Sequence, residues 1–117
     1  MPNSTQNVLD HHLKCFSEGD LEGILSDYEP SAVLFTPGGS LKGQEAFKPM
    51  FQAMFSEFAK PGASFAMNQL SVEGEYAYIF WNAETADNLY EAATDTFVVR
   101  NGKIVAQSFA AKVTPKP

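Results

Sequence analysis

The sequence predicts an α+β fold, because three segments with helical periodicity precede a long run of strands. Apolar residues recur at helical spacing in residues 5–18, 21–28 and 44–60. From residue 64 onward, β-branched and aromatic residues dominate, and turn signals at 87–88 and 100–102 divide this region into strands. With 117 residues, the chain is expected to form one domain over residues 1–117.

The first helix is expected to begin at a cap provided by Ser4 or Thr5 and to run until Gly19 ends it. Helical spacing places His12 on the inward side of this helix. His11 falls on the flank of the same helix by its phase. Of the two histidines, His12 is therefore the candidate for a role in a buried site.

The next elements are a short helix, a hairpin and a longer helix. Asp20 is placed to cap the short helix over residues 21–28. Residues 32–36 are predicted to form a short strand, and residues 41–43 the short second strand of a hairpin. The helix over residues 44–60 carries phenylalanine and methionine at helical spacing, which gives it an aromatic, apolar face.

Four strands are predicted to follow, at residues 64–71, 76–85, 89–99 and 103–113. A two-residue turn at 87–88 would place Phe80 opposite Asp95 in the sheet. In the last hairpin, a three-residue loop at 100–102 pairs Asp95 with Gln107, whereas a two-residue turn pairs it with Ser108. Both registers stay open.

This register gives each face of the sheet its own apolar side chains. One face would carry Tyr78, Phe80, Phe97 and Phe109, and the other Ile79, Trp81, Val98 and Ile104. The first face is expected to meet a pocket and the helices, and the second to meet another copy of the chain. The sequence therefore predicts a homodimer with Trp81 at the dimer surface.

The charge pattern argues against several classes of partner. The formal net charge is −6, and the eight Lys and Arg residues are scattered singly, so no basic stripe is available for nucleic acid or an anionic membrane. No stretch approaches the roughly 20 apolar residues of a membrane span. We therefore expect neither nucleic acid nor membrane as a partner.

Cysteine and histidine usage argue against metals and covalent chemistry. Cys15 is the single cysteine, so it cannot form an intramolecular disulfide, and a reducing cytoplasm is the expected location. The two histidines are adjacent on a helix and point about 100° apart, so they cannot readily share a metal ion. A glycine-rich phosphate loop is also absent from the sequence. No metal and no cofactor are expected.

Three segments, at residues 19–25, 32–39 and 95–104, together with the order of elements, resemble the nuclear transport factor 2-like superfamily. The closest likeness is to its SnoaL-like branch, and it extends over roughly residues 8–113. The resemblance implies a cone-shaped α+β barrel, in which a curved, mainly antiparallel sheet wraps around three helices and encloses a deep apolar pocket, commonly in a dimer. The superfamily includes ketosteroid isomerases, polyketide cyclases, dehydratases, epoxide hydrolases and non-enzymatic binding modules, so the fold alone leaves the function open.

The ketosteroid isomerase pattern can be compared residue by residue. Asp95 falls on the acidic residue of the penultimate strand, which those enzymes keep protonated. His12 stands at the position of the oxyanion-hole tyrosine, and Thr36 stands at that of the general base. A threonine does not take a proton from a carbon acid near neutral pH. The resemblance therefore supports the pocket rather than that family's reaction.

The resemblance also implies that His12 and Asp95 face each other near the floor of the pocket. A carboxylate that accepts a hydrogen bond from one imidazole nitrogen makes the other nitrogen a better base, which suits hydration, dehydration, cyclisation or aldol-type chemistry. The predicted polar contacts to a ligand come from Thr36, Asn82 and Gln107. The predicted apolar wall is Phe51, Phe55, Tyr78, Phe80, Phe97 and Phe109.

A structural role for His12 and Asp95 is the alternative. A histidine and an aspartate from two elements can satisfy one another as a buried polar pair without any catalysis. In that case the chain would be a non-catalytic module that binds a small apolar or aromatic molecule, or another protein. The sequence leaves both interpretations open.

Overall fold

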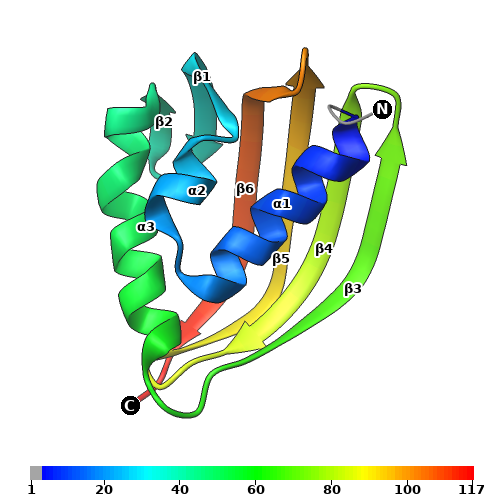
Figure 1. Cartoon of the computed structure of the whole chain (residues 1–117). Helices are drawn as coiled ribbons and strands as arrows, with labels where there is room; N and C mark the ends of the chain where they lie inside the picture. The colour runs from blue at the N-terminus through cyan, green and yellow to red at the C-terminus, as the bar shows by residue number, and fades with distance from the viewer. Residues whose placement is uncertain (1–3) are drawn as a thin grey trace.

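A six-stranded sheet forms one layer of the molecule, and three helices lie across its concave face (Figure 1). The computed structural model describes residues 4–117. The elements are α1 (Thr5–Glu18), α2 (Leu21–Leu25), β1 (Tyr28–Thr36), β2 (Gly39–Lys42), α3 (Gln44–Ala59), β3 (Ser64–Glu73), β4 (Tyr76–Glu84), β5 (Asn88–Arg100) and β6 (Lys103–Pro115). The predicted α+β class is confirmed.

The strands are ordered β2-β1-β6-β5-β4-β3 across the sheet. All neighbouring pairs are antiparallel except β1 and β6, which run parallel. The sheet is curved but does not close, because β2 and β3 are free edges. Its hollow side is covered by α1 and α3, and the space between them and the sheet holds the core (Figure 1).

The boundaries of α1 match the prediction. The hydroxyl of Ser4 accepts a hydrogen bond from the backbone N–H of Asn7, which caps the first turn. At the other end, Gly19 has a φ of 66°, a left-handed conformation that glycine adopts without steric cost. Asp20 then caps α2 by accepting the N–H of Gly23, also as predicted.

The second helix is shorter than predicted, because it ends at Leu25 rather than at Tyr28. Tyr28 is only 1 % exposed and is already part of β1, where it pairs with Ile104 of β6. Pro30 contributes to this outcome, since the residue before a proline is disfavoured in the helical conformation. Asp27 therefore lies in the short connection between α2 and β1.

The register between β4 and β5 differs from the prediction by one residue. Asp95 pairs with Ile79, not with Phe80. The hairpin turns over residues 86–87, with the N–H of Thr85 donating to the carbonyl of Asn88, and an extra residue in β5 near Glu91 adds a bulge. These two features together shift the strand by an odd number of residues, which turns every side chain of β4 to the other face.

The last hairpin has the two-residue turn, but neither predicted register is correct. Asn101 and Gly102 both have positive φ angles, 52° and 77°, as a tight hairpin turn requires. A bulge at Val105 then adds one residue to β6, so that Asp95 pairs with Phe109. Gln107 stays on the same face as Asp95, because it lies two residues from Phe109 along the strand.

As a consequence, the predicted faces of β4 are reversed. Ile79 and Trp81 are buried on the inner face, at 4 % exposure each. Tyr78 and Phe80 alternate with them and lie on the outer face, half-buried. The prediction that Trp81 lies on a surface facing another subunit is therefore wrong.

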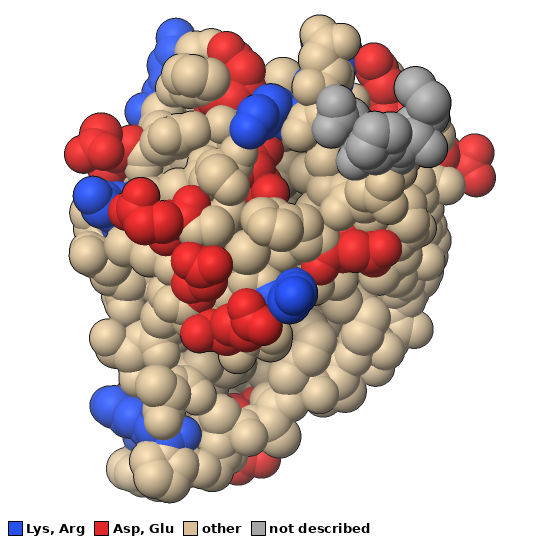
Figure 2. All heavy atoms as spheres, in the orientation of Figure 1, with Lys and Arg blue, Asp and Glu red and all other residues tan. Residues whose placement is uncertain are grey.

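Most of the face that carries the helices is uncharged, and carboxylates predominate among its charged side chains (Figure 2). Among residues 4–117, none of the helices is long and apolar enough to cross a membrane.

Candidate pocket with two buried ionisable groups

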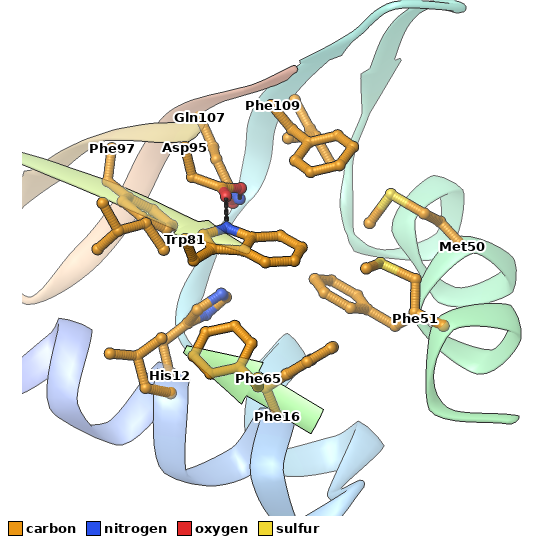
Figure 3. A pocket seen from close by; sticks show the side chains of 14 residues that line it. His12, Phe16, Met50, Phe51, Phe65, Trp81, Asp95, Phe97, Gln107 and Phe109 are labelled. Carbon is orange, nitrogen blue, oxygen red and sulfur yellow. Dashed lines mark hydrogen bonds between the residues drawn. The ribbon is translucent and has the colours of Figure 1, made fainter. Parts of the chain in front are cut away.

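A pocket of about 70 Å³ lies between α1, α3 and the inner face of the sheet (Figure 3). One water molecule needs about 10–15 Å³ of such a cavity, so the pocket has room for several waters or one small organic molecule. Aliphatic, aromatic and thioether groups form most of its wall. The lining residues are His12, Leu13, Phe16, Leu34, Met50, Phe51, Met54, Phe65, Ile79, Trp81, Asp95, Phe97, Gln107 and Phe109.

Asp95 lies in the middle of β5 and is 7 % exposed. The indole Nε1–H of Trp81 donates to its Oδ1 at 2.9 Å, and Nε2 of Gln107 donates to its Oδ2 at 2.9 Å (Figure 3). Burial raises the pKa of Asp95, and this effect outweighs the two hydrogen bonds and the charge of His12, which act in the opposite direction. Asp95 therefore binds a proton more readily than an exposed aspartate does.

Tyr28 fixes the orientation of the Gln107 amide. The Tyr28 hydroxyl donates to Oε1 of Gln107, which leaves Nε2 of Gln107 to donate to Asp95. Burial, followed by the charges of Asp95 and Asp27, raises the pKa of Tyr28, so its hydroxyl remains a donor. Asp95 thus accepts an N–H on each oxygen. Any proton that it binds must occupy one of the remaining lone pairs.

His12 enters the pocket from α1 and is 6 % exposed. Its ring packs edge-on against three aromatic rings at centroid distances of 5.3 to 6.3 Å, those of Tyr28, Phe51 and Phe97. Within the part of the chain that the structure describes, no hydrogen bond joins His12 to Asp95. Nδ1 of His12 lies instead 3.6 Å from Oδ2 of Asp27.

The other predicted site residues divide into two groups. Phe51, Phe97, Gln107 and Phe109 line the pocket. Phe55 does not line the pocket, but its ring stacks on that of the lining residue Phe51, with 6.0 Å between the centroids. The sequence pattern placed these five side chains on the correct side, whereas Ile104, predicted on the outer face with Val98, is 1 % exposed in the core.

Four predicted site residues lie away from the pocket. Tyr78, Phe80 and Asn82 are on the outer face of β4, where Asn82 accepts a hydrogen bond from Asn68. Their placement follows from the register of the β4–β5 hairpin. Thr36 lies at the turn between β1 and β2, and its hydroxyl donates to the carbonyl of Gly39 at 2.8 Å. These four side chains do not line the pocket.

Several lining residues were missed by sequence reasoning. Phe16 follows His12 by one helical turn, so the helical period of α1 contained a signal for it. Met50 and Met54 lie one turn apart on α3 and contained a similar signal. Trp81 and Phe65 come from strands, and no local pattern fixed which face they occupy.

Cys15 is a buried free thiol whose Sγ lies 3.5 Å from Nε2 of His11. Burial, and then the charge of Asp27, raises the pKa of the Cys15 thiol, which disfavours the thiolate form needed by a nucleophile. Among residues 4–117, no group of three His, Cys, Asp or Glu side chains is placed to hold a metal ion.

The sequence matches the SnoaL-like domain family over residues 9–107. The chain belongs to this family. Among curated proteins, no match to the sequence is found.

Solved structures similar to this SnoaL-like chain share its fold at low sequence identity. SalBIII, described as an epoxide hydrolase/cyclase-like enzyme in pyran ring formation of the polyether salinomycin, is 16% identical, with a TM-score of 0.79 over 96% of this chain and 95% of its own. A Kribbella flavida protein provisionally named a ketosteroid isomerase is 13% identical, with a TM-score of 0.75 over 97% and 81%. An NTF2-like protein of unknown function from Mesorhizobium loti is 19% identical, with a TM-score of 0.74 over 92% and 90%.

Proposed function

We propose that this SnoaL-like protein binds a small apolar or aromatic molecule with one oxygen function in its pocket, and that His12 and Asp95 carry out an acid–base step on it. The observation that supports this most strongly is the presence of two buried ionisable side chains in one mainly apolar cavity. Burying ionisable groups costs free energy unless they are paired. For this reason, buried ionisable groups in a cavity mark a candidate functional site. The elements that present them, α1 and β5, approach the cavity from different sides (Figure 3).

In this proposal the two groups have different roles. Nε2 of His12 accepts a proton from the carbon next to a carbonyl group of the ligand, so that a C–H bond breaks and an N–H bond forms. Protonated Asp95 donates a hydrogen bond to the carbonyl oxygen, where negative charge develops. The proton then returns from His12 to the ligand at the same or another atom. This chemistry is common to isomerisation, cyclisation and dehydration of carbonyl compounds.

A non-catalytic binding module is the second candidate. It is favoured by the fact that both oxygens of Asp95 already accept hydrogen bonds from the protein. In such a module, Asp95 and His12 would shape the pocket and orient the ligand without proton transfer.

Binding can be tested with the fluorescence of Trp81, the single tryptophan of the sequence and part of the pocket wall. We expect cyclohexanone to change this fluorescence in a saturable way. Cyclohexanecarboxylate, of similar shape but anionic, is expected to bind at least about tenfold more weakly at neutral pH, because its charge would lose its hydration in a mainly apolar pocket whose described wall contains neither lysine nor arginine. Equal binding of the two compounds, or binding of neither, would contradict the proposal.

Catalysis can be tested without knowing the natural ligand. In deuterium oxide, the protein is expected to exchange the protons next to the carbonyl of cyclohexanone, as followed by NMR. Replacing His12 with glutamine should reduce this exchange by about 100-fold or more while preserving the buried size of the side chain. Saturable binding without exchange would favour the non-catalytic module.

The proposal also includes self-association through the outer face of the sheet. Tyr78, Phe80 and Val98 lie half-buried on this face, and a second copy would cover them. Sedimentation that gives a monomer at micromolar concentration would contradict this part. A location in the cytoplasm belongs to the same proposal and is supported by the free, buried thiol of Cys15.

A further inference from the structure

The carboxylate of Asp27 lies between the two histidines of α1. Oδ1 is 2.6 Å from Nδ1 of His11, and Oδ2 is 3.6 Å from Nδ1 of His12. The Asp27 side chain is 8 % exposed, and that of His12 is 7 % exposed. In the part of the chain that the structure describes, Nδ1 of His12 and Oδ2 of Asp27 are buried with no hydrogen-bond partner.

These two unpartnered atoms face each other, and this decides where the proton of His12 lies. If Nδ1 carried no proton, its lone pair would point at a carboxylate oxygen in a buried region, which is unfavourable. If Nδ1 carries the proton, the N–H points at an acceptor of opposite charge, and a small rotation of either side chain brings it into hydrogen-bond range. A neutral imidazole protonated on Nδ1 has its lone pair on Nε2.

We propose that Asp27 is a positioning residue for His12, which holds the ring in the tautomer with Nδ1–H and thereby leaves Nε2 as the basic atom in the pocket. This inference rests on the proposed function for its catalytic consequence, but the tautomer itself does not depend on any ligand. When Nε2 takes up a proton, the Asp27 carboxylate also compensates the positive charge of the ring. Asp95 remains the group that contacts the ligand oxygen.

His11 has a separate part in this arrangement. Its side chain is 49 % exposed, and its Nδ1 is hydrogen-bonded to Oδ1 of Asp27. Because a carboxylate only accepts hydrogen bonds, we assign the proton of this contact to Nδ1 of His11. This contact leaves only Oδ2 for His12 and prevents the carboxylate from rotating freely. The backbone supports the same position, since the carbonyl of Asp27 accepts the N–H of Ile104 at 2.8 Å.

The Asp27→Asn variant gives a sharp test, because an amide has one acceptor and one donor end. The close contact with His11 is expected to take the amide oxygen, which turns the NH2 group toward Nδ1 of His12. His12 should then change to the tautomer with Nε2–H and lose its lone pair in the pocket. In Ser-His-Asp triads, replacing the aspartate with asparagine leaves the histidine in the wrong tautomer in the same way.

The measurement is a long-range proton–nitrogen NMR correlation of the ligand-free, nitrogen-15-labelled protein at about pH 8, which distinguishes protonated from unprotonated ring nitrogens. We expect Nδ1–H for His12 in the wild type and Nε2–H in Asp27→Asn. The matched control is Asp10→Asn, which removes an exposed carboxylate from α1 and should leave the tautomer unchanged. In the exchange assay with cyclohexanone, Asp27→Asn should be slower by at least about tenfold.

Two results would overturn the inference: Nε2–H as the main tautomer in the wild type, or Nδ1–H retained in a folded Asp27→Asn variant. The wild-type spectrum decides the question alone if the variant does not fold. A wild type with Nδ1–H that switches in Asp27→Asn, but shows no exchange with any ketone, would remove the acid–base function and keep the role of Asp27.

Discussion

Replacing Glu57 with alanine is expected to destabilise the protein by about 2–3 kcal/mol, because the change removes the acceptor of three buried or half-buried donors. Glu57 lies in the last turn of α3 and accepts hydrogen bonds from Thr85 at 2.6 Å, Asn88 at 2.9 Å and Tyr90 at 2.9 Å. Thr85 is fully buried, so its hydroxyl has no access to water as a substitute. Urea unfolding at neutral pH measures the loss.

The pH dependence of this loss is also predicted. Burial raises the pKa of Glu57, but the hydrogen bonds from Asn88, Thr85 and Tyr90 outweigh it and hold the pKa below its usual value. The ionised side chain therefore stabilises the native state above the unfolded-state pKa of about 4.3, and this contribution is lost as pH falls through the folded-state pKa. The gap between wild type and Glu57→Ala should narrow toward acidic pH.

Glu45→Ala is the control for this prediction, because Glu45 is an exposed glutamate in the first turn of the same helix. Its replacement should cost no more than about 0.5–1 kcal/mol, the usual value of a charge near a helix end. If Glu57→Ala lowered the free energy of unfolding no more than Glu45→Ala does, the hydrogen bonds from the β4–β5 hairpin to Glu57 would contribute nothing to stability.

The hydrogen bond between Glu57 and Thr85 also illustrates which parts of the fold the sequence could not predict. The helix starts at Ser4 and Asp20 and the stop at Gly19 depend on residues within one turn of each boundary, and these predictions are confirmed. The register of β4 depends instead on how Thr85 closes the turn and on a bulge near Glu91. Thr85 is held by a glutamate 28 residues earlier in the chain, which no local pattern displays.

The same distinction between local and long-range signals applies to the candidate site. The helical period of α1 predicted the inward side for His12, and the family resemblance implied that His12 and Asp95 both reach the pocket, where both lie. Trp81 was assigned to the wrong face, because an odd shift in register reverses a whole strand. Asp27 was missed because it sits in a connection that the pattern predicted as helix. Side-chain positions that depend on the helical period could thus be predicted, whereas those that depend on the geometry of turns and connections could not.

Asp95→Asn is expected to be less stable than the wild type at about pH 4 and to lose this disadvantage as pH rises toward 8. A protonated aspartate can still accept N–H groups from Trp81 and Gln107 on its two oxygens. Asparagine has only one acceptor, so its NH2 group faces a donor, at a cost of about 1–3 kcal/mol. Rotating the Gln107 amide does not remove the conflict, because the Tyr28 hydroxyl then loses its acceptor.

The change with pH follows from the raised pKa of Asp95. The native state holds this proton more tightly than the unfolded state does, so the contribution of Asp95 is fully present below the unfolded-state pKa of about 3.9 and is lost as pH rises through the folded-state pKa. Asparagine does not titrate, so the stability of the variant does not fall in this way as pH rises. Urea midpoints of the two proteins at about pH 4, 6 and 8 measure the trend.

The same variant also tests the proposed catalytic role of Asp95. In the exchange assay, Asp95→Asn should lose about 100-fold in rate, because it has no proton on oxygen to share with a carbonyl group. A stability gap that stayed constant across this pH range would mean that Asp95 is not protonated in the pocket. Unchanged exchange in the folded variant would mean that Asp95 has no part in catalysis, and would leave His12 with Asp27 as the acid–base group.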